Sequence, residues 1–253
     1  MHVISYKTHK IGVKEDLLAL LDRYVPPLAE RNVVAITSKV VALCQGRVVE
    51  KNLKIRKEDL IKREADWFIE QELSRPNAIS ITIKEGIFIA SAGIDESNAQ
   101  EYYILWPYHP QQAAAAIWAH LRRRDHLKDL GVILTDSQTR PLRWGVTGVG
   151  IAWCGFHPLW DCRGAPDIWG YALRVTTVNV LDGLAAAAVL MMGESAEQTP
   201  ITVIRDAPYM RFLNTPPTEE ETQTLRITLQ EDLYAPLLEH ASWQQGGGGI
   251  IFE

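Results

Sequence analysis

The chain has 253 residues, of which 47% are hydrophobic and 23% charged, a balance typical of a soluble globular protein with one substantial core. Its formal net charge of −5 excludes a broadly basic surface for nucleic acid. No apolar run approaches the length of a membrane span, so we expect neither nucleic acid nor a membrane as a partner.

The first third of the chain predicts two strands and two helices. Apolar runs at 3–6 and 33–36 are typical of strands, and the second reads as fully buried. Helical spacing of apolar residues predicts a helix over 16–30, which Pro26-Pro27 kinks or ends. A second helix is expected over 58–73, where apolar positions recur among many charges.

The middle of the chain predicts a hairpin, a helix and a buried strand. Residues 79–83 and 87–90 alternate around a Lys-Glu-Gly turn. A helix is expected over 110–127, and its basic run, 122–124, is interpreted as a solvated helix end with phosphate binding as the alternative. The apolar residues of 132–136 then predict a strand that ends in an acidic residue.

The last third predicts two helices around one strand. The alanine-rich stretch 176–192 is apolar nearly all round, which indicates a buried helix. A strand is expected at 201–204, and an amphipathic helix from Thr218 onward. The glycine run at 246–249 is interpreted as a flexible tail.

This order of elements predicts an α/β fold. We divide it into a catalytic unit, 1–215, and a C-terminal helical segment with a tail, 216–253. The three cysteines are widely spaced and odd in number, so no disulfide framework or paired zinc motif is expected. A reduced, cytoplasmic setting fits this usage. Cys154 is expected to be a buried structural thiol, although the nearby His157 leaves a nucleophile open.

Three acidic residues stand at places where α/β proteins put ligands. Asp95 follows a predicted strand, Asp136 ends one, and Glu194 follows the end of the buried helix. Hard oxygen donors of this kind suit magnesium or manganese, which would neutralise a nucleotide phosphate. The alternatives for the three residues are an Asx-turn, a helix cap and a solvated residue, respectively.

Other segments supply groups for anions. The sequence Thr-Ser-Lys at 37–39 leads from a buried strand into a helix start, where hydroxyls cap and free N–H groups receive an anion. Arg140, Arg143 and Arg163 are candidate catalytic residues that contact an anionic substrate, because a guanidinium binds two oxygens at once. The phosphate-loop pattern GxxxxGK[ST], the zinc helix HExxH and the serine elbow GxSxG are all absent from the sequence.

Five segments together resemble the coenzyme F-420-0:L-glutamate ligase (gamma-glutamyl ligase) family, including a folate-related branch. They are AITSKVVALCQGRVV, SAGIDESN, GVILTDSQTRPLRWGVTGVGIA, DCRGAPDIWG and VLDGLAAAAVLMMGE, and they occur in the family's order. The resemblance implies a mixed-sheet α/β fold of the family's own type, distinct from P-loop and Rossmann folds, and an intertwined homodimer. It also implies GTP-dependent ligation of L-glutamate to an acceptor carboxylate through an acyl phosphate, with two Mg²⁺ or Mn²⁺ ions and potassium. The heterocyclic acceptor is either a coenzyme F-420 precursor or a folate.

The resemblance also assigns roles to individual positions. Asp95 and Asp136 are expected to bind one metal, and Ser137 and Glu194 a second. The nucleotide contacts it implies are Thr8, His9, Lys10, Ile11, Ser38, Lys39 and Asn98.

Three positions depart from the family pattern, namely Leu43, Tyr171 and Gly183. They keep open the alternative of a non-catalytic paralogue that binds a nucleotide or another ligand. The sequence also leaves GTP against ATP open.

Overall fold

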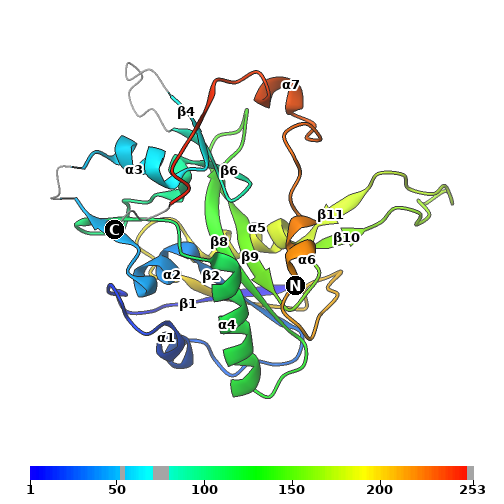
Figure 1. The fold of residues 1–253 in the computed structure, drawn as a ribbon. Helices are drawn as coiled ribbons and strands as arrows, with labels where there is room; N and C mark the ends of the chain where they lie inside the picture. The colour runs from blue at the N-terminus through cyan, green and yellow to red at the C-terminus, as the bar shows by residue number, and fades with distance from the viewer. Residues whose placement is uncertain (52–54, 71–79, 250–253) are drawn as a thin grey trace.

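A five-stranded mixed sheet forms the centre of the molecule in the computed structural model, which describes residues 1–51, 55–70 and 80–249 (Figure 1). Only the β2–β8 pair is parallel; the other neighbouring strands are antiparallel. In spatial order the strands are β1 (His2–Tyr6), β12 (Ile201–Arg205), β2 (Asn32–Thr37), β8 (Leu130–Thr139) and β9 (Val146–Cys154). The predicted α/β class is therefore confirmed, with a mixed sheet.

Helices cover both faces of this sheet. Their bounds are α1 (Leu17–Tyr24), α2 (Ser38–Gln45), α3 (Lys57–Glu64), α4 (Pro110–Arg124), α5 (Val180–Met192), α6 (Glu219–Gln223) and α7 (Ala235–Leu238). Val34 and Ile36 of β2 pack in one core with α1, α2 and α4, whereas Val33 and Ala35 pack with α5 on the opposite face. The central strand is apolar at successive positions because both of its faces are buried. None of the helices in the described ranges is long and apolar enough to cross a membrane.

The first helix is shorter than predicted. Asp16 caps α1, because its Oδ1 accepts hydrogen bonds from the N–H groups of Leu18 and Ala19 at 2.9 and 3.1 Å. The helix ends at Tyr24, before Pro26-Pro27, and not at residue 30. A proline disfavours helical backbone at the residue before it, which accounts for the early end.

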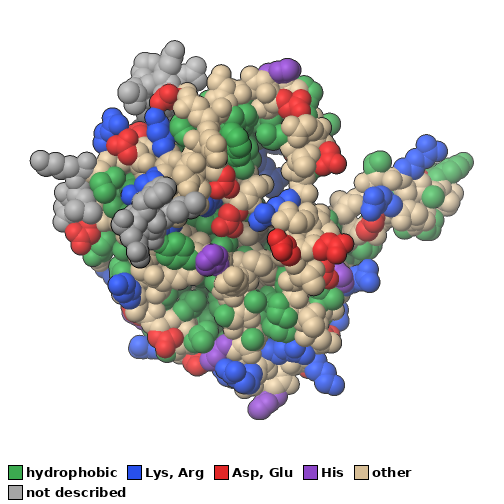
Figure 2. All heavy atoms as spheres, viewed as in Figure 1, with side chains coloured by type: hydrophobic (Ala, Val, Ile, Leu, Met, Phe, Trp, Pro, Cys, Tyr) green, Lys and Arg blue, Asp and Glu red, His purple; other side chains and the backbone are tan. Residues whose placement is uncertain are grey.

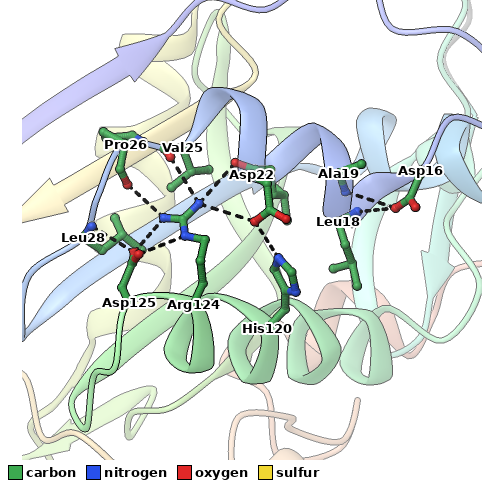
Figure 3. A network of polar contacts seen from close by, with 11 residues as sticks. Asp16, Leu18, Ala19, Asp22, Val25, Pro26, Leu28, His120, Arg124 and Asp125 are labelled. Carbon is green, nitrogen blue, oxygen red and sulfur yellow. Dashed lines mark hydrogen bonds and ion pairs between the residues drawn. The ribbon is translucent and has the colours of Figure 1, made fainter.

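The basic run at the end of α4 includes a structural arginine. Arg124 donates to the carbonyls of Val25 and Pro26 at 3.2 and 3.0 Å, and His120 Nε2 lies 2.7 Å from Asp22 Oδ1 (Figure 3). These contacts tie α4 to α1 and to the loop that follows α1. The interpretation as a simple solvated helix end was wrong for Arg124, because it satisfies carbonyls that the end of α1 leaves free.

A second sheet has four strands, β13 (Trp243–Gln245), β4 (Trp67–Ile69), β5 (Ile81–Lys84) and β6 (Ile87–Ala90), in that order. The predicted hairpin is confirmed as β5–β6, although Ile79 lies outside the described residues. Its turn residues Glu85 and Gly86 both have positive φ, 48° and 74°, as a two-residue turn matching the strand twist requires. The helix predicted over 58–73 ends at Glu64, because residues 67–69 instead pair with β5; residues 71–73 lie outside the described ranges.

Two further strand pairs complete the fold, β3 (Val48–Glu50) with β7 (Tyr102–Ile104) and β10 (Leu159–Asp161) with β11 (Thr177–Asn179). A short 3₁₀ turn, η1 (Ser91–Gly93), precedes the Asp95 loop. The predicted buried helix over 176–192 is α5, which starts later than expected because 177–179 pair with β10. The chain between β10 and β11 forms an arm that projects from the molecule (Figure 1).

Strand β9 was not predicted from the sequence, in which glycines interrupt its apolar residues. Gly148 and Gly150 instead allow α5 to lie directly on the sheet. A Cβ added at Gly148 would lie 2.3 Å from the carbonyl oxygen of Ala185, and one at Gly150 would lie 2.4 Å from Leu181 Cγ. Glycine is therefore required here for the close approach of the helix.

The amphipathic helix expected from Thr218 onward was wrong as a single element. Thr218 begins α6 in a capping box with Glu221, but α6 ends at Gln223. The hydroxyls of Thr222 and Thr224 donate to backbone carbonyls three residues earlier, at 2.6 and 2.7 Å. Such local side-chain bonds compete with continued helix formation. Only α7 and β13 follow in the described part of the chain after α6.

The glycine run at 246–249, predicted to be a flexible tail, is a docked strand end that we call the glycine strap. Its four N–H groups donate to the carbonyls of residues 62–66 at 2.9 to 3.0 Å. A Cβ added at Gly246 would lie 2.1 Å from the carbonyl oxygen of Ala65, and Lys84 Nζ donates to Gly248 O at 3.0 Å. The prediction of a flexible tail was wrong, because glycine at these positions permits close contact between two backbones.

Candidate active site

A pocket of about 690 Å³ opens at the end of the central sheet. Segments from five parts of the chain line it: the loop 8–13, the start of α2, the loop 98–102, the end of strand β8 and the chain following α5. The predicted site residues that line it are Thr8, His9, Lys10, Ile11, Lys39, Asn98, Asp136, Ser137 and Glu194. Asp95 and Ser38 adjoin this main pocket without lining it. The structure thus brings most of the predicted nucleotide and metal residues together.

The start of the loop 8–13 is held in place by contacts of Thr8 and His9. The N–H of buried Thr8 donates to Gln198 O at 2.9 Å. His9 Nδ1 lies 2.7 Å from the hydroxyl of Tyr24, and His9 Nε2 lies 2.8 Å from Glu15 Oε2. The loop therefore forms an ordered wall of the pocket, and the His9 ring is already engaged.

The Thr-Ser-Lys segment stands where β2 passes into α2. Ser38 is the first residue of α2, and Thr37, the N-cap, makes no side-chain cap hydrogen bond. The prediction that its hydroxyl caps the helix was wrong for Thr37. An uncapped helix start leaves N–H groups available to an anion in the adjoining pocket.

Lys39 is surrounded by the carboxylates of Asp95, Asp136 and Glu194, which we call the carboxylate cluster. Its Nζ forms an ion pair with Asp95. Burial lowers the pKa of Lys39, but the attraction of the three carboxylates outweighs burial and raises it. Lys39 is therefore a half-buried, charged ammonium group at the centre of the predicted metal site.

Asp95 is held in an Asx-turn and by the ammonium group together. Its Oδ1 accepts hydrogen bonds from Ser97 N at 2.7 Å and from Ser97 Oγ at 2.6 Å. Burial raises the pKa of Asp95, but Lys39 and these hydrogen bonds outweigh burial and lower it below its usual value. Asp95 therefore forms an Asx-turn and also belongs to the carboxylate cluster, so the two alternatives for this residue are compatible.

Asp136 has one buried oxygen, Oδ2, that lacks a hydrogen-bond partner within the described ranges. Its Oδ1 accepts from the N–H of Ser137 at 2.8 Å. Burial raises the pKa of Asp136 to about 7, and the nearby Asp95 and Glu194 contribute to the rise. A Cβ added at Gly93 would lie 3.2 Å from this Oδ2 and 2.4 Å from the Trp106 ring, so the carboxylate is closely packed. An unpartnered buried oxygen calls for a proton or a cation.

The second predicted metal pair is in contact. Ser137 Oγ donates to Glu194 Oε1 at 2.6 Å, which joins the end of β8 to the chain after α5. Asn98 Nδ2 donates to Ser195 O at 2.8 Å and so links its loop to the same segment.

The side chains of the carboxylate cluster and Ser137 suit a hard divalent cation in kind. Carboxylate and hydroxyl oxygens are the donors that magnesium and manganese prefer, and Asp136 Oδ2 offers an open one. Within the part of the chain that the structure describes, no group of three or more His, Cys, Asp or Glu side chains is arranged to hold a metal ion. Lys39 supplies a positive charge among these carboxylates instead. The donors fit a hard cation in kind, and the predicted ligand sets stay predictions.

The three predicted arginines do not line the main pocket. Arg140 and Arg143 are exposed on the turn between β8 and β9. Arg163 lies on the projecting arm, where its Nη2 contacts Asp161 Oδ2 at 2.6 Å in an exposed ion pair. Arg140 does act on Asp182 near the start of α5, where its charge opposes the rise that burial gives to the pKa of that carboxyl.

Sequence reasoning missed the segment 195–200, all of whose residues line the pocket. Thr199 Oγ1 donates to Met192 O at 2.6 Å and fixes this segment against the end of α5. Its only sequence signal is its position between the buried helix and β12. Cys154, which burial gives a pKa of about 12, is confirmed as a buried thiol outside the pocket.

Similar proteins agree with the resemblance noted in the sequence. The family model described as F420-0:gamma-glutamyl ligase matches residues 6–206. A coenzyme F420:L-glutamate ligase of Methanococcus maripaludis is 33% identical over 223 residues, covering 82% of this chain and 89% of the relative. Proteins of that name from Methanopyrus kandleri and Methanocaldococcus jannaschii are 35% and 29% identical, covering 78% of this chain each and 82% and 84% of the relatives. All residues named above in the main pocket lie inside the matched range.

Proposed function

Because this chain belongs to the F420-0:gamma-glutamyl ligase family of amide-forming ligases, we propose that it joins L-glutamate to a carboxylate of a coenzyme F420 precursor, using GTP. The observation that carries this proposal is the position of Lys39 within the carboxylate cluster, beside the start of α2. Such a site combines a cation and helix N–H groups for phosphate with acidic donors for a metal.

The proposed reaction has two steps. In the first, a carboxylate oxygen of the acceptor forms a bond to the γ-phosphorus of GTP, the bond from that phosphorus to the β–γ bridging oxygen breaks, and GDP leaves. In the second, the glutamate amine attacks the acyl carbon, the bond from that carbon to the phosphate oxygen breaks, and inorganic phosphate leaves. The attacking nitrogen loses its proton to a base or to water, and an amide remains.

Lys39 and the start of α2 are suited to hold the phosphates in the first step. The ammonium group offsets negative charge on the transferred phosphoryl, and N–H groups at the helix start donate to phosphate oxygens. We assign the loop containing Thr8, His9, Lys10 and Ile11, together with Ser38 and Asn98, to nucleotide contacts. The pocket volume of about 690 Å³ lies within the range of sites that enclose a large ligand.

We assign metal binding to Asp95 and Asp136 for one ion, and to Ser137 and Glu194 for another. Magnesium or manganese bound there would neutralise charge on the phosphates, and potassium is a further candidate. Asp136 contributes the oxygen that lacks a partner in the described structure. Lys39 would then be free to turn from Asp95 toward the phosphates.

We also propose an intertwined homodimer. Several large apolar side chains are exposed on the β8–β9 turn and on the projecting arm, among them Trp144 at 104%, Ile168 at 91% and Trp169 at 79%. Figure 2 shows green apolar side chains beside basic ones on the projecting arm. A soluble monomer rarely exposes such a group of side chains, and a second copy would cover it.

The test is turnover with defined substrates. The protein is supplied with GTP, Mg²⁺, L-glutamate and either the coenzyme F420 precursor or a folate, and phosphate release and product mass are measured. Acceptor-dependent phosphate release, with a product heavier by one glutamyl residue, supports the ligase. Nucleotide binding without turnover on any acceptor would instead favour a non-catalytic paralogue.

A further inference from the structure

A second cavity, of about 230 Å³, lies between the β5–β6 turn, strand β9, the start of α5 and the C-terminal segment. This volume is below the range of sites for drug-sized ligands, which suits a small polar metabolite. It is too small for a nucleotide or a fused heterocycle. Its polar lining residues are Glu85, Gln111, Gln138, Asn179, Asp182, Thr222 and Arg226.

The charges around this second cavity are mixed in sign. Glu85 and Asp182 provide two carboxylates, and Arg226 provides a guanidinium that extends over Gly86, with its Cδ 3.3 Å from the position of an added Cβ. Arg140, on the β8–β9 turn, lies close enough for its charge to act on Asp182. Two cationic and two anionic groups match a molecule that carries an ammonium and two carboxylates.

The lining residue Trp153 has a buried N–H donor without an acceptor among the described residues. Trp153 is 3% exposed, and its indole Nε1 has no partner among the described residues. A buried N–H without an acceptor is costly, and a ligand oxygen would satisfy it.

The cavity is next to the carboxylate cluster. Gln138 follows Asp136 by two residues on β8, so their side chains share a face of the sheet about 7 Å apart. Val149, the cross-strand partner of Asp136, lines the cavity as well. A molecule bound there therefore lies beside the place proposed for phosphoryl transfer.

We propose that this cavity binds the incoming amino acid, an α-amino dicarboxylate, and that Arg226 recognises one of its carboxylates. Glu85 would face the ammonium group before it loses a proton for attack. Asp182 would act on that group through its charge, because its Oδ1 and Oδ2 already accept from Gly150 N at 2.9 Å and Asn179 Nδ2 at 2.7 Å. This proposal rests on the ligase function proposed above and names the amino-acid subsite of that reaction.

One wall of the subsite comes from outside the family match. Thr222, Leu225 and Arg226 belong to the C-terminal segment, whereas the match ends at residue 206. Figure 2 shows the surface hollowed between the central strands and the chain that leads from α6 to α7. Amino-acid selection in this chain therefore depends on residues that the matched region does not supply.

The first experiment compares Arg226→Met with wild type in steady-state ligation. We expect the KM for L-glutamate to rise roughly 10- to 100-fold, as for the loss of a charged hydrogen bond, with the KM for GTP unchanged. The preference for glutamate over glutamine should fall as well, a change that general loosening of the fold would not produce. Arg226→Lys should restore part of the affinity, and Arg123→Met, an exposed change at the end of α4, serves as the matched control.

The outcomes separate the two proposals. If wild type is active and Arg226→Met has the same KM for glutamate and the same preference for glutamate over glutamine, the proposed subsite is wrong. The proposed ligase function is not affected by that result. If wild type turns over no acceptor, the ligase proposal fails, and binding of L-glutamate is then measured directly by saturation-transfer NMR. Wild-type binding that Arg226→Met weakens supports the subsite, and binding that is absent or equal in both proteins overturns it.

Discussion

Replacing Asp136 by Asn tests whether its buried oxygen is a metal ligand. The substitution keeps the size of the side chain and removes its negative charge. Ligation should be lost, because the proposed cation would lose a carboxylate donor. The folded structure should persist, since within the described residues the side chain of Asp136 accepts a single hydrogen bond, from the adjacent N–H of Ser137.

The size of the stability effect follows from the burial of this group. Burial raises the pKa of Asp136 from 3.8 to about 7, a difference that corresponds to at most roughly 4 kcal/mol. Because the pKa of Asp136 is higher in the folded state than in the unfolded state, ionising this carboxyl lowers the free energy of unfolding. The protonated carboxyl therefore gives its full contribution to stability below about pH 4, and this contribution is lost as the pH rises through 7. Without a divalent cation, Asp136→Asn should therefore be more stable than wild type at pH 8, and by less at pH 5.

The assay is thermal unfolding followed by circular dichroism, with EDTA or with Mg²⁺, at both pH values. Mg²⁺ should stabilise wild type at pH 8 and have little effect on Asp136→Asn, because a ligand that binds only the folded state raises its stability. Asp206→Asn, a change at an exposed carboxylate, is the control. Equal stabilisation of both proteins by Mg²⁺, or a metal-free variant less stable than wild type at pH 8, would refute the reasoning.

Three further substitutions test the packing. Gly183→Ala should stabilise the protein by about 0.5–1 kcal/mol, because among the described residues no atom outside the backbone of helix α5 lies within 4 Å of the added Cβ; a lower melting temperature would contradict this. Gly246→Ala should release the glycine strap, since its Cβ would lie 2.1 Å from Ala65 O, and faster amide exchange at 247–249 would report it. Glu64→Gln should cost about 3–5 kcal/mol in urea unfolding, because it leaves buried Arg47 without its ion-pair partner; a loss below 1 kcal/mol would show that the pair is dispensable.

Sequence reasoning located the carboxylate cluster because its members stand at the ends of strongly patterned elements. Asp136 was expected at the end of a buried strand, where α/β sheets bind ligands, and Glu194 at the end of the alanine-rich helix. Parallel pairing of β2 with β8 then brings Thr37 opposite Thr135 and sets Lys39 beside Asp136. Element ends are predictable where hydrophobic periodicity is strong.

The arginines show what charge alone does not reveal. Arg163 satisfies Asp161 on the projecting arm, and the guanidinium beside the second cavity comes from Arg226, which no motif marked. Glycines were mispredicted for a similar reason. A glycine that allows a flexible loop and a glycine that allows two backbones to pack closely cannot be distinguished from the sequence alone. The roles of Gly148 and Gly246 emerge only when the opposing backbone is in place.

The glycine strap gives the C-terminal segment an anchor built almost wholly from peptide groups. Its amide-to-carbonyl bonds carry no net charge, whereas Arg226 acts through a charge at the surface. At 1 M salt the Debye length shrinks to about 3 Å, which weakens exposed charge contacts and leaves neutral backbone bonds in place. At high salt, the preference for glutamate over glutamine should therefore fall, whereas the glycine strap should keep the C-terminal segment docked.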